Sequence, residues 1–231
     1  MVTIIACTMR PAFMENLFRN YARQKHVNKE MIVILNRDDM NLEVWRNKAK
    51  EYSNVRVYKV PQSYKLGKCL NFAIKRAKYD VIAKFDDDDY YAPHYLIESV
   101  EAMKRTHADI VGKSASFIYF EESKSLMVLR PRDENRFTKH MKGGTLVFKK
   151  RVWDRIKFSQ SRVSGSDAQF LRMSRKAGFK LYTVSRYNYV CIRRRDISSH
   201  TQKTSTAKYM KKCKFICHTD HYIRRIRKKM V

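Results

Sequence analysis

The chain has 231 residues, 44% of them hydrophobic, which is enough for one substantial core and at most a small appendage. Its 50 Lys and Arg against 22 Asp and Glu give a formal net charge of +28, which exceeds ordinary surface decoration and implies a polyanionic partner or substrate. The five scattered cysteines, the opening without a basic segment and the absence of a long apolar run argue against a disulfide scaffold, a secretory signal and a membrane span. We therefore expect a cytoplasmic protein without a transmembrane segment, either free or peripheral at the inner face of an anionic membrane.

Short apolar runs alternate with segments of helical period in the first half, which is typical of βαβ units around a mostly parallel sheet. Helices are expected after Pro11, around Trp45, around Ile74 and from about Pro93. Strands are predicted over residues 2–7, 31–35, 55–60 and 81–85.

The pattern changes after Val111, so the second half is expected to be mixed. Residues 116–120 and 126–129, separated by a polar EESKS, predict a β-hairpin. A helix is expected between Ser166, which resembles the start of a capping box with Gln169, and the stop at Gly178. Further strands are predicted over 145–148, 179–184 and 187–192.

The tail is expected to form a basic amphipathic helix. Its apolar face would carry Met210, Cys213, Ile216, Ile223, Ile226 and Met230. From Cys191 onward thirteen Lys and Arg stand against two Asp, so the tail either contacts a polyanion or an anionic membrane, or packs its apolar side on the domain. Helical spacing of Cys213, Cys217 and His221 makes a zinc site conceivable, although the spacing matches no standard finger.

Four consecutive aspartates, Asp86 to Asp89, follow the strand expected over 81–85, where open α/β sheets place their ligands. Ionised and unpaired, they would repel one another, so a cation is expected beside them. Mg²⁺ or Mn²⁺ suits carboxylate and phosphate oxygens. The alternatives are a solvated acidic loop or a calcium site.

The segments IIACTMRP, MIVILNRDD, GKCLN and FDDDDYYAPHYL, in this order, resemble the family-2 glycosyltransferases of the A-type nucleotide-sugar fold. The resemblance implies an α/β fold with a single Rossmann-like domain and a mixed central sheet over residues 1–200, with the basic helical tail over 201–231. It places Thr8 and Arg10 near the nucleotide base. Asn36 stands where relatives usually carry an acidic residue, with Asp38 nearby.

The same resemblance implies that Lys68 lies near the diphosphate, with Asn71 in a structural or nucleotide-side position. Asp86 and Asp88 would form the Asp-x-Asp pair, in which Asp88 holds the metal and Asp86 and Asp87 lie on the nucleotide side. The register in which Asp87 and Asp89 act remains open.

VSGSDAQFLRMSRKAGFKLY resembles the segment that carries the catalytic base, which implies this role for Asp167, with Ser166 replacing the more usual first acid. Alternatively, Asp167 only complements the helix dipole, which would lower its pKa. RRRDISSHT resembles a loop that closes over the diphosphate, so Arg193, Arg194 and Arg195 would screen the leaving group, unless they form a solvated basic run. His200 is either a metal ligand or a surface residue.

These implications together describe an inverting hexosyltransferase that uses Mn²⁺ or Mg²⁺ and a nucleotide-diphosphate sugar, expected to be a UDP-sugar. The acceptor would be an anionic polymer of the cell envelope, a glycan or modified nucleic acid. The alternatives are a nucleic-acid-binding protein, favoured by the charge and the tyrosines, and a metal-dependent nucleotidyltransferase. Neither a P-loop nor a dinucleotide glycine fingerprint is present in the sequence.

Overall fold

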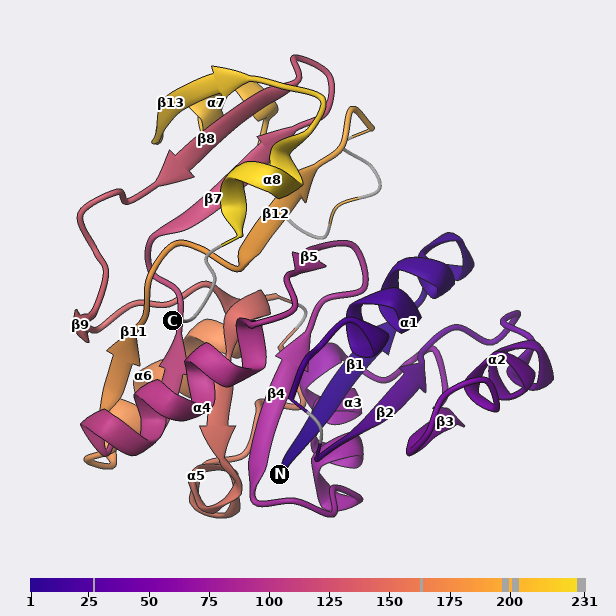
Figure 1. Cartoon of the computed structure of the whole chain (residues 1–231). Coiled ribbons are helices and arrows are strands. Elements are labelled where there is room, and N and C mark those ends of the chain that lie inside the picture. Colours follow the sequence, from indigo (N-terminus) through magenta and orange to yellow (C-terminus); the bar gives the residue numbers. More distant parts are fainter. Residues whose placement is uncertain (27, 163, 197–199, 201–203, 228–231) are drawn as a thin grey trace.

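A computed structural model describes residues 1–26, 28–162, 164–196, 200 and 204–227. Within these residues the chain forms two sheets, one above the other in Figure 1, with helices around them. The larger sheet has eight strands in the described part, in the spatial order β3 (Val55–Lys59), β2 (Lys29–Leu35), β1 (Val2–Thr8), β4 (Val81–Phe85), β10 (Val147–Lys149), β6 (Ile110–Gly112), β11 (Leu181–Thr183) and β9 (Arg136–Phe137).

Strands β3, β2, β1 and β4 are parallel, whereas β10 runs antiparallel between β4 and β6. The mixed α/β sheet is therefore as predicted, and it places the carboxyl ends of β1 and β4 side by side. Because Asp86 follows β4 directly, the acidic run lies at this edge of the sheet.

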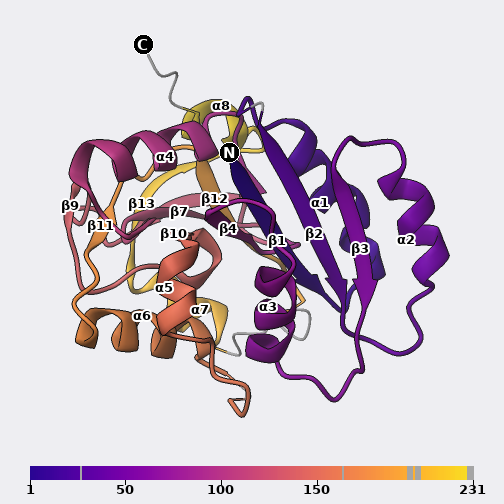
Figure 2. The same ribbon diagram turned by 90° about the horizontal axis from the view of Figure 1, so that it is seen from below.

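Helices cover both faces of the larger sheet (Figure 2). One face packs against α1 (Met14–Ala22), α2 (Leu42–Ala49) and α4 (Tyr95–Thr106), and the opposite face against α3 (Leu66–Lys75), α5 (Lys150–Arg155) and α6 (Ser166–Lys176). Short 3-10 turns, η1 (Pro11–Phe13) and η2 (Gly143–Thr145), precede α1 and β10. The strand predicted over 145–148 therefore starts later, at Val147. Among the described helices, none is long and apolar enough to cross a bilayer.

The expected capping box at Ser166 is wrong. Gly165 is the N-cap of α6, in a left-handed conformation with φ 74°, and it has no side-chain cap; Ser166 is already helical and buried. The predicted stop is confirmed, because Gly178 follows the C-cap with φ 86°.

The smaller sheet has five strands in the described part, in the order β13 (Cys213–His218), β8 (Ser125–Leu129), β7 (Ser116–Phe120), β12 (Tyr189–Arg193) and β5 (Tyr90–Tyr91). The predicted hairpin is confirmed as the antiparallel pair β7 and β8. Apolar side chains of β7 alternate between the two faces of this sheet, where one meets α7 (Thr206–Met210) and the other α8 (Tyr222–Ile226).

The continuous amphipathic helix predicted for the tail is wrong. Residues from Cys213 to His218 form β13, which pairs antiparallel with β8, and only the short α7 and α8 flank it (Figure 1). An open strand edge offers hydrogen bonds to the whole segment, which outweighs its helical apolar spacing. The zinc hypothesis fails with the helix, since no group of three metal-binding side chains occurs in the described part of the chain. Met230 lies outside the described residues.

Candidate active site

A cavity of about 850 Å³ opens at the carboxyl ends of β1 and β4, beside the smaller sheet. All four aspartates of the acidic run line it, together with Asp167 at the start of α6. The fold thus brings together two acidic segments that are about 80 residues apart in the sequence.

Amide side chains of α1 fix the backbone of the acidic run. Asn16 Nδ2 donates to the carbonyl oxygens of Asp87, at 2.7 Å, and Asp89, at 3.0 Å, and Asn20 Nδ2 donates to that of Asp89 at 2.8 Å. Tyr91 completes the turn, because its hydroxyl accepts from the Asp86 amide at 2.8 Å. The carboxylates are therefore held in place by contacts that leave side-chain oxygens for the cavity.

Asp87 pairs with the two residues predicted at the nucleotide. Its Oδ2 accepts from the Thr8 hydroxyl at 2.5 Å and from Arg10 Nε at 3.2 Å, and Arg10 Nη2 pairs with Oδ1. Burial raises the pKa of Asp87, and the Arg10 guanidinium opposes this rise. Thr8, Arg10 and Asp87 thus form one connected group at the ends of β1 and β4.

Asp88 faces two arginines. Its Oδ2 lies 2.9 Å from Arg10 Nη1 and 2.7 Å from Arg194 Nη2. Burial alone would raise the pKa of Asp88, but the two guanidinium groups outweigh it and lower the pKa. Arg194 Nη2 also lies 3.2 Å from His200 Nδ1, so its guanidinium lies between the two predicted metal ligands.

His200 is largely buried, which rules out the plain surface residue considered from the sequence. Burial, followed by the charges of Arg194 and Arg193, lowers its pKa to about 4, so the ring is neutral near pH 7. A neutral imidazole nitrogen can bind a metal ion.

Lys84 links the two acidic segments. This buried lysine points from β4 between Asp86 Oδ1, at 2.6 Å, and Asp167 Oδ2, at 3.2 Å, and also donates to the Gly143 carbonyl at 3.3 Å. Burial alone would lower the pKa of Lys84, but Asp167 and Asp86 outweigh it and raise the pKa, so the lysine stays charged. Lys84 therefore supplies part of the positive charge that the four aspartates require.

Asp167 keeps one oxygen available. Its Oδ1 is buried and has no hydrogen-bond partner within the described residues, while Oδ2 pairs with Lys84. Burial raises the pKa of Asp167, with Lys84 opposing and Asp86 reinforcing the rise. The helix-dipole alternative predicted a lowered pKa, which is the opposite direction, and a raised pKa favours a proton acceptor.

Two consecutive glycines close the cavity wall in η2. A Cβ on Gly143 would overlap the Asp167 carboxylate, and one on Gly144 would overlap Asp86 Oδ2. Gly144 also accepts a hydrogen bond of 2.5 Å from the Tyr91 hydroxyl through its carbonyl oxygen. Side chains at either position would push the acids out of place.

Asp89 lines the cavity, but both of its side-chain oxygens accept hydrogen bonds from β12. Its Oδ1 accepts from the Ile192 amide at 3.1 Å, its Oδ2 accepts from the Tyr189 hydroxyl, and burial raises its pKa to about 7. Asp89 therefore anchors β12 to the acidic turn, and the register with Asp88 facing the cavity cations is the one that this geometry favours.

Within the described residues, four predicted residues neither line the cavity nor pair with an acid that lines it. Asn36 and Asp38 lie at the same sheet edge, where they bind the Pro61 carbonyl and the Gln62 amide. Arg195 is mostly exposed and lies 3.8 Å from Glu122. Arg193 and Arg194, by contrast, reach the site; Ile197–Ser199 and Thr201 of the same segment lie outside the described residues.

Lys68 is the fourth, and it lies over the Tyr64 ring in a separate groove. Leu66 of the same helix lines the cavity, and two residues further along a helix is about 200° around its axis, so Lys68 points to the other side. Asn71 is structural: its side chain accepts from the Trp153 indole at 2.8 Å and donates to the Phe158 carbonyl at 2.9 Å.

Sequence reasoning missed several cavity residues. A lysine inside the apolar run VIAKF and the pair of glycines in KGGT were visible signals. Others carried none, because they come from loops, from β12 and from the tail: Ser114, Arg130, Lys142, Cys191, Tyr209 and Lys212.

Three side chains of the site carry donor atoms of the kind that bind a divalent ion. These side chains are Asp86, Asp88 and the neutral His200. Within the described residues they do not form a three-residue metal cluster, because Arg194 lies between Asp88 and His200. Mg²⁺ is often held by one or two carboxylates plus substrate phosphates, which fits this set.

The chain is similar in sequence to one known protein family. The family model described as Glycosyl transferase family 2 matches residues 2–159. No curated relative matches the sequence.

Similar solved structures include S. aureus TarS 1-349 in complex with UDP-GlcNAc, with 18% identity and a TM-score of 0.69, over 89% of this chain and 61% of that one. Mannosyltransferase PcManGT from Pyrobaculum calidifontis, in complex with GDP-Man and Mn²⁺, has 19% identity and a TM-score of 0.64, over 83% of this chain and 56% of that one. The chain thus spans about three fifths of these structures. At such identities the likeness shows the fold alone, which is the A-type glycosyltransferase fold.

Proposed function

The chain belongs to glycosyl transferase family 2, and on that premise we propose that its cavity transfers a sugar from a nucleotide-diphosphate sugar to an acceptor hydroxyl. The observation that carries this proposal is the Asp86–Lys84–Asp167 link. It fixes a proton-accepting carboxylate beside the acidic turn where the donor diphosphate would bind. The bound UDP-GlcNAc and GDP-Man of the two similar structures support a donor of this class.

Asp167 is proposed as the general base. Its unpartnered Oδ1 takes the proton of the acceptor hydroxyl while that oxygen attacks the anomeric carbon. The bond from this carbon to the diphosphate oxygen breaks in the same displacement, and its electron pair leaves with the nucleotide diphosphate. The sugar configuration is inverted, because a single displacement occurs.

The leaving group carries negative charge that cations of the site can screen. Arg193 lines the cavity and Arg194 and Arg10 lie at Asp88, whereas Arg195 points away. We assign screening to these three arginines and leave Arg195 out of it. We assign binding of the nucleotide to the connected group of Thr8, Arg10 and Asp87. Asn36 and Asp38 at the same edge of the sheet complete this proposed nucleotide site.

Mn²⁺ or Mg²⁺ would be held by Asp88, with Asp86 and His200 as further donors, and would supply charge stabilisation for the diphosphate. Arg194 has to give up its contacts with Asp88 and His200 when the ion binds. The net charge of +28 favours an anionic acceptor.

The proposal is tested by thermal shift with UDP-GlcNAc and GDP-Man, each with and without Mn²⁺. One nucleotide sugar is expected to stabilise the protein only with the metal, because specific binding favours the folded state by mass action. In Asp88→Ala this metal-dependent shift is expected to vanish.

Asp167→Asn is the matched variant for chemistry. It should keep the donor shift while lowering transfer by roughly 10²–10⁴-fold, the usual contribution of a general base. Transfer at the wild-type rate in Asp167→Asn, or equal stabilisation of Asp88→Ala by donor and metal, would contradict the assigned roles.

A further inference from the structure

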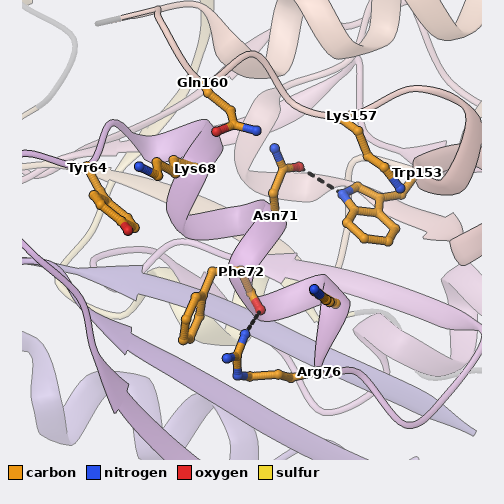
Figure 3. A pocket seen from close by; sticks show the side chains of 9 residues that line it. Tyr64, Lys68, Asn71, Phe72, Arg76, Trp153, Lys157 and Gln160 are labelled. Carbon is orange, nitrogen blue, oxygen red and sulfur yellow. Dashed lines mark hydrogen bonds between the residues drawn. The ribbon is translucent and has the colours of Figure 1, made fainter.

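A second hollow lies outside the active-site cavity, on the outer side of α3 (Figure 3). It has a volume of about 700 Å³ and is called the α3 groove below. Its lining comes from α3 and the residues on either side of it, from α5 and from the residues that follow α5: Tyr64, Lys68, Asn71, Phe72, Lys75, Arg76, Trp153, Lys157 and Gln160. None of the roles assigned above accounts for this collection of side chains.

The groove is strongly cationic. Four of its nine lining residues are lysine or arginine, and none of the nine is acidic. Among the described residues, the carboxylate that approaches one of these cations is Asp154, 3.9 Å from Lys157 Nζ and mostly exposed. At that distance and exposure it neutralises little of the charge. The groove therefore attracts anions.

Three of the cations lie over aromatic rings. Lys68 Nζ lies 3.6 Å from the centroid of the Tyr64 ring, and Lys157 Nζ lies 3.2 Å from that of the Trp153 ring. The guanidinium carbon of Arg76 lies 3.5 Å from the centroid of the Phe72 ring. Ring contacts keep the cations in place without cancelling their charge. The same contacts cover ring faces on which nucleic-acid bases would otherwise stack.

The cations are spread along α3 instead of converging on one point. Lys68 and Lys75 are seven residues apart, which is about 10 Å along a helix, and Arg76 is about 12 Å from Lys68. A single phosphate needs donors that converge within hydrogen-bond distance. This spacing instead suits an extended chain with several anionic groups.

The groove and the active-site cavity lie on opposite sides of the first turn of α3. Leu66, which lines the cavity, and Lys68, which lines the groove, are on the same first turn of α3. Gly67 between them packs so closely on the Ser159 carbonyl and Ser166 that a Cβ would overlap the former. Ser166 precedes Asp167 directly, so this contact forms the wall between the groove and the cavity close to the proposed base.

We propose that the α3 groove binds a linear phosphodiester chain of polyol or sugar units without aromatic bases, and leads it to the cavity. Its use as an acceptor track rests on the proposed function, whereas binding itself does not. The chain's phosphates would lie along Lys68, Lys75, Arg76 and Lys157.

Binding is measured with a poly(glycerol phosphate) oligomer as the probe, by fluorescence anisotropy at two salt concentrations. Wild-type protein should bind it, and more weakly at the higher salt. The variant Lys75→Gln/Lys157→Gln, which removes two exposed cations of the groove, should bind on the order of tenfold more weakly. Inorganic phosphate should compete poorly, because it cannot span the groove.

Lys104→Gln/Arg105→Gln is the matched control, since it removes two exposed cations from the end of α4 and lowers the net charge equally. An equal loss of affinity in this control would overturn the proposal, because attraction would then be due to overall charge. Tighter binding of single-stranded DNA with the same number of phosphates would also overturn it and indicate a nucleic-acid groove. The metal-dependent donor shift, measured on the same samples, reports separately on the proposed function.

Discussion

At the scale of the single residue, Lys84 determines how the site is charged. A lysine with only 4% of its side chain exposed is costly unless carboxylates accompany it, and here Asp86 and Asp167 do so from two segments of the chain. The lysine therefore acts on the proposed base without needing to contact the substrate. It is a positioning residue that also opposes the burial-induced rise in the pKa of Asp167.

Lys84→Met is predicted to change the pH dependence of transfer. Removing the cation leaves burial and Asp86, both of which raise the pKa of Asp167, so that pKa rises further. Asp167 acts as a base only above its pKa, so the acidic limb of kcat/KM should move to higher pH. The measurement is a pH–rate profile of the variant beside that of Lys149→Met, because Lys149 pairs with Asp109, which precedes β6. An acidic limb that stays in place or moves to lower pH would refute this role.

At the scale of the element, the turn η2 shapes the site because two of its residues have no side chain. Gly143 and Gly144 bring backbone against Asp167 and Asp86, and the Tyr91 hydroxyl holds Gly144 from β5. Tyr91 itself stacks on Phe85 at the end of β4, with centroids 3.8 Å apart. Three elements thus set the position of the carboxylates with little room for adjustment.

Gly144→Ala is predicted to weaken donor binding by displacing Asp86, whose Oδ2 the new methyl group would overlap. We expect at least a tenfold loss of affinity, since a displacement of about 1 Å in a positioned site can cost far more. Gly178→Ala serves as the control: its Cβ would meet nothing within 4 Å, and its positive φ costs roughly 1–2 kcal/mol of stability. Donor titration and chemical unfolding of both variants separate the two effects; unchanged donor affinity in Gly144→Ala would contradict the prediction.

At the scale of the whole molecule, one buried polar network joins the two sheets. Lys113 follows β6 of the larger sheet, and its Nζ donates to the Ser185 carbonyl at 2.7 Å and pairs with Glu98 of α4 at 3.1 Å. Glu98 also accepts from Asn188, at 3.2 Å, which precedes β12 of the smaller sheet. Two passages of the chain from the larger sheet to the smaller one, after β6 and before β12, are therefore tied to α4.

Lys113→Met is predicted to destabilise the fold by about 3–5 kcal/mol, because it leaves the Glu98 carboxylate buried without its cation. The measurement is urea unfolding near pH 7. The double variant Lys113→Met/Glu98→Gln should recover part of the loss, since it removes the unpaired charge as well. A single-variant loss below 1 kcal/mol would show that water or a neighbouring group compensates the carboxylate.

Most of the strands and helices up to β12, the mixed second half and the place of the acidic run after β4 were predictable from the sequence, whereas β5, β9 and α5 were not predicted. The predictable features follow from local periodicity and from the position of polar residues at strand ends, which depend on neighbours along the chain. The sequence also singled out Asp167, which the structure places in the same cavity as Asp86 to Asp89.

The contacts between segments that are far apart in the chain became visible only in the three-dimensional structure. In the structure, Lys84 and the Gly143–Gly144 turn contact the carboxylates of the site, and Lys68 points away from the cavity. The tail pairs with β8 as a strand. The physical reason is that burial, ion pairing and an open strand edge act between segments far apart in the chain. Helical spacing in the tail was real in the sequence, but the free edge of β8 offered that segment more hydrogen bonds.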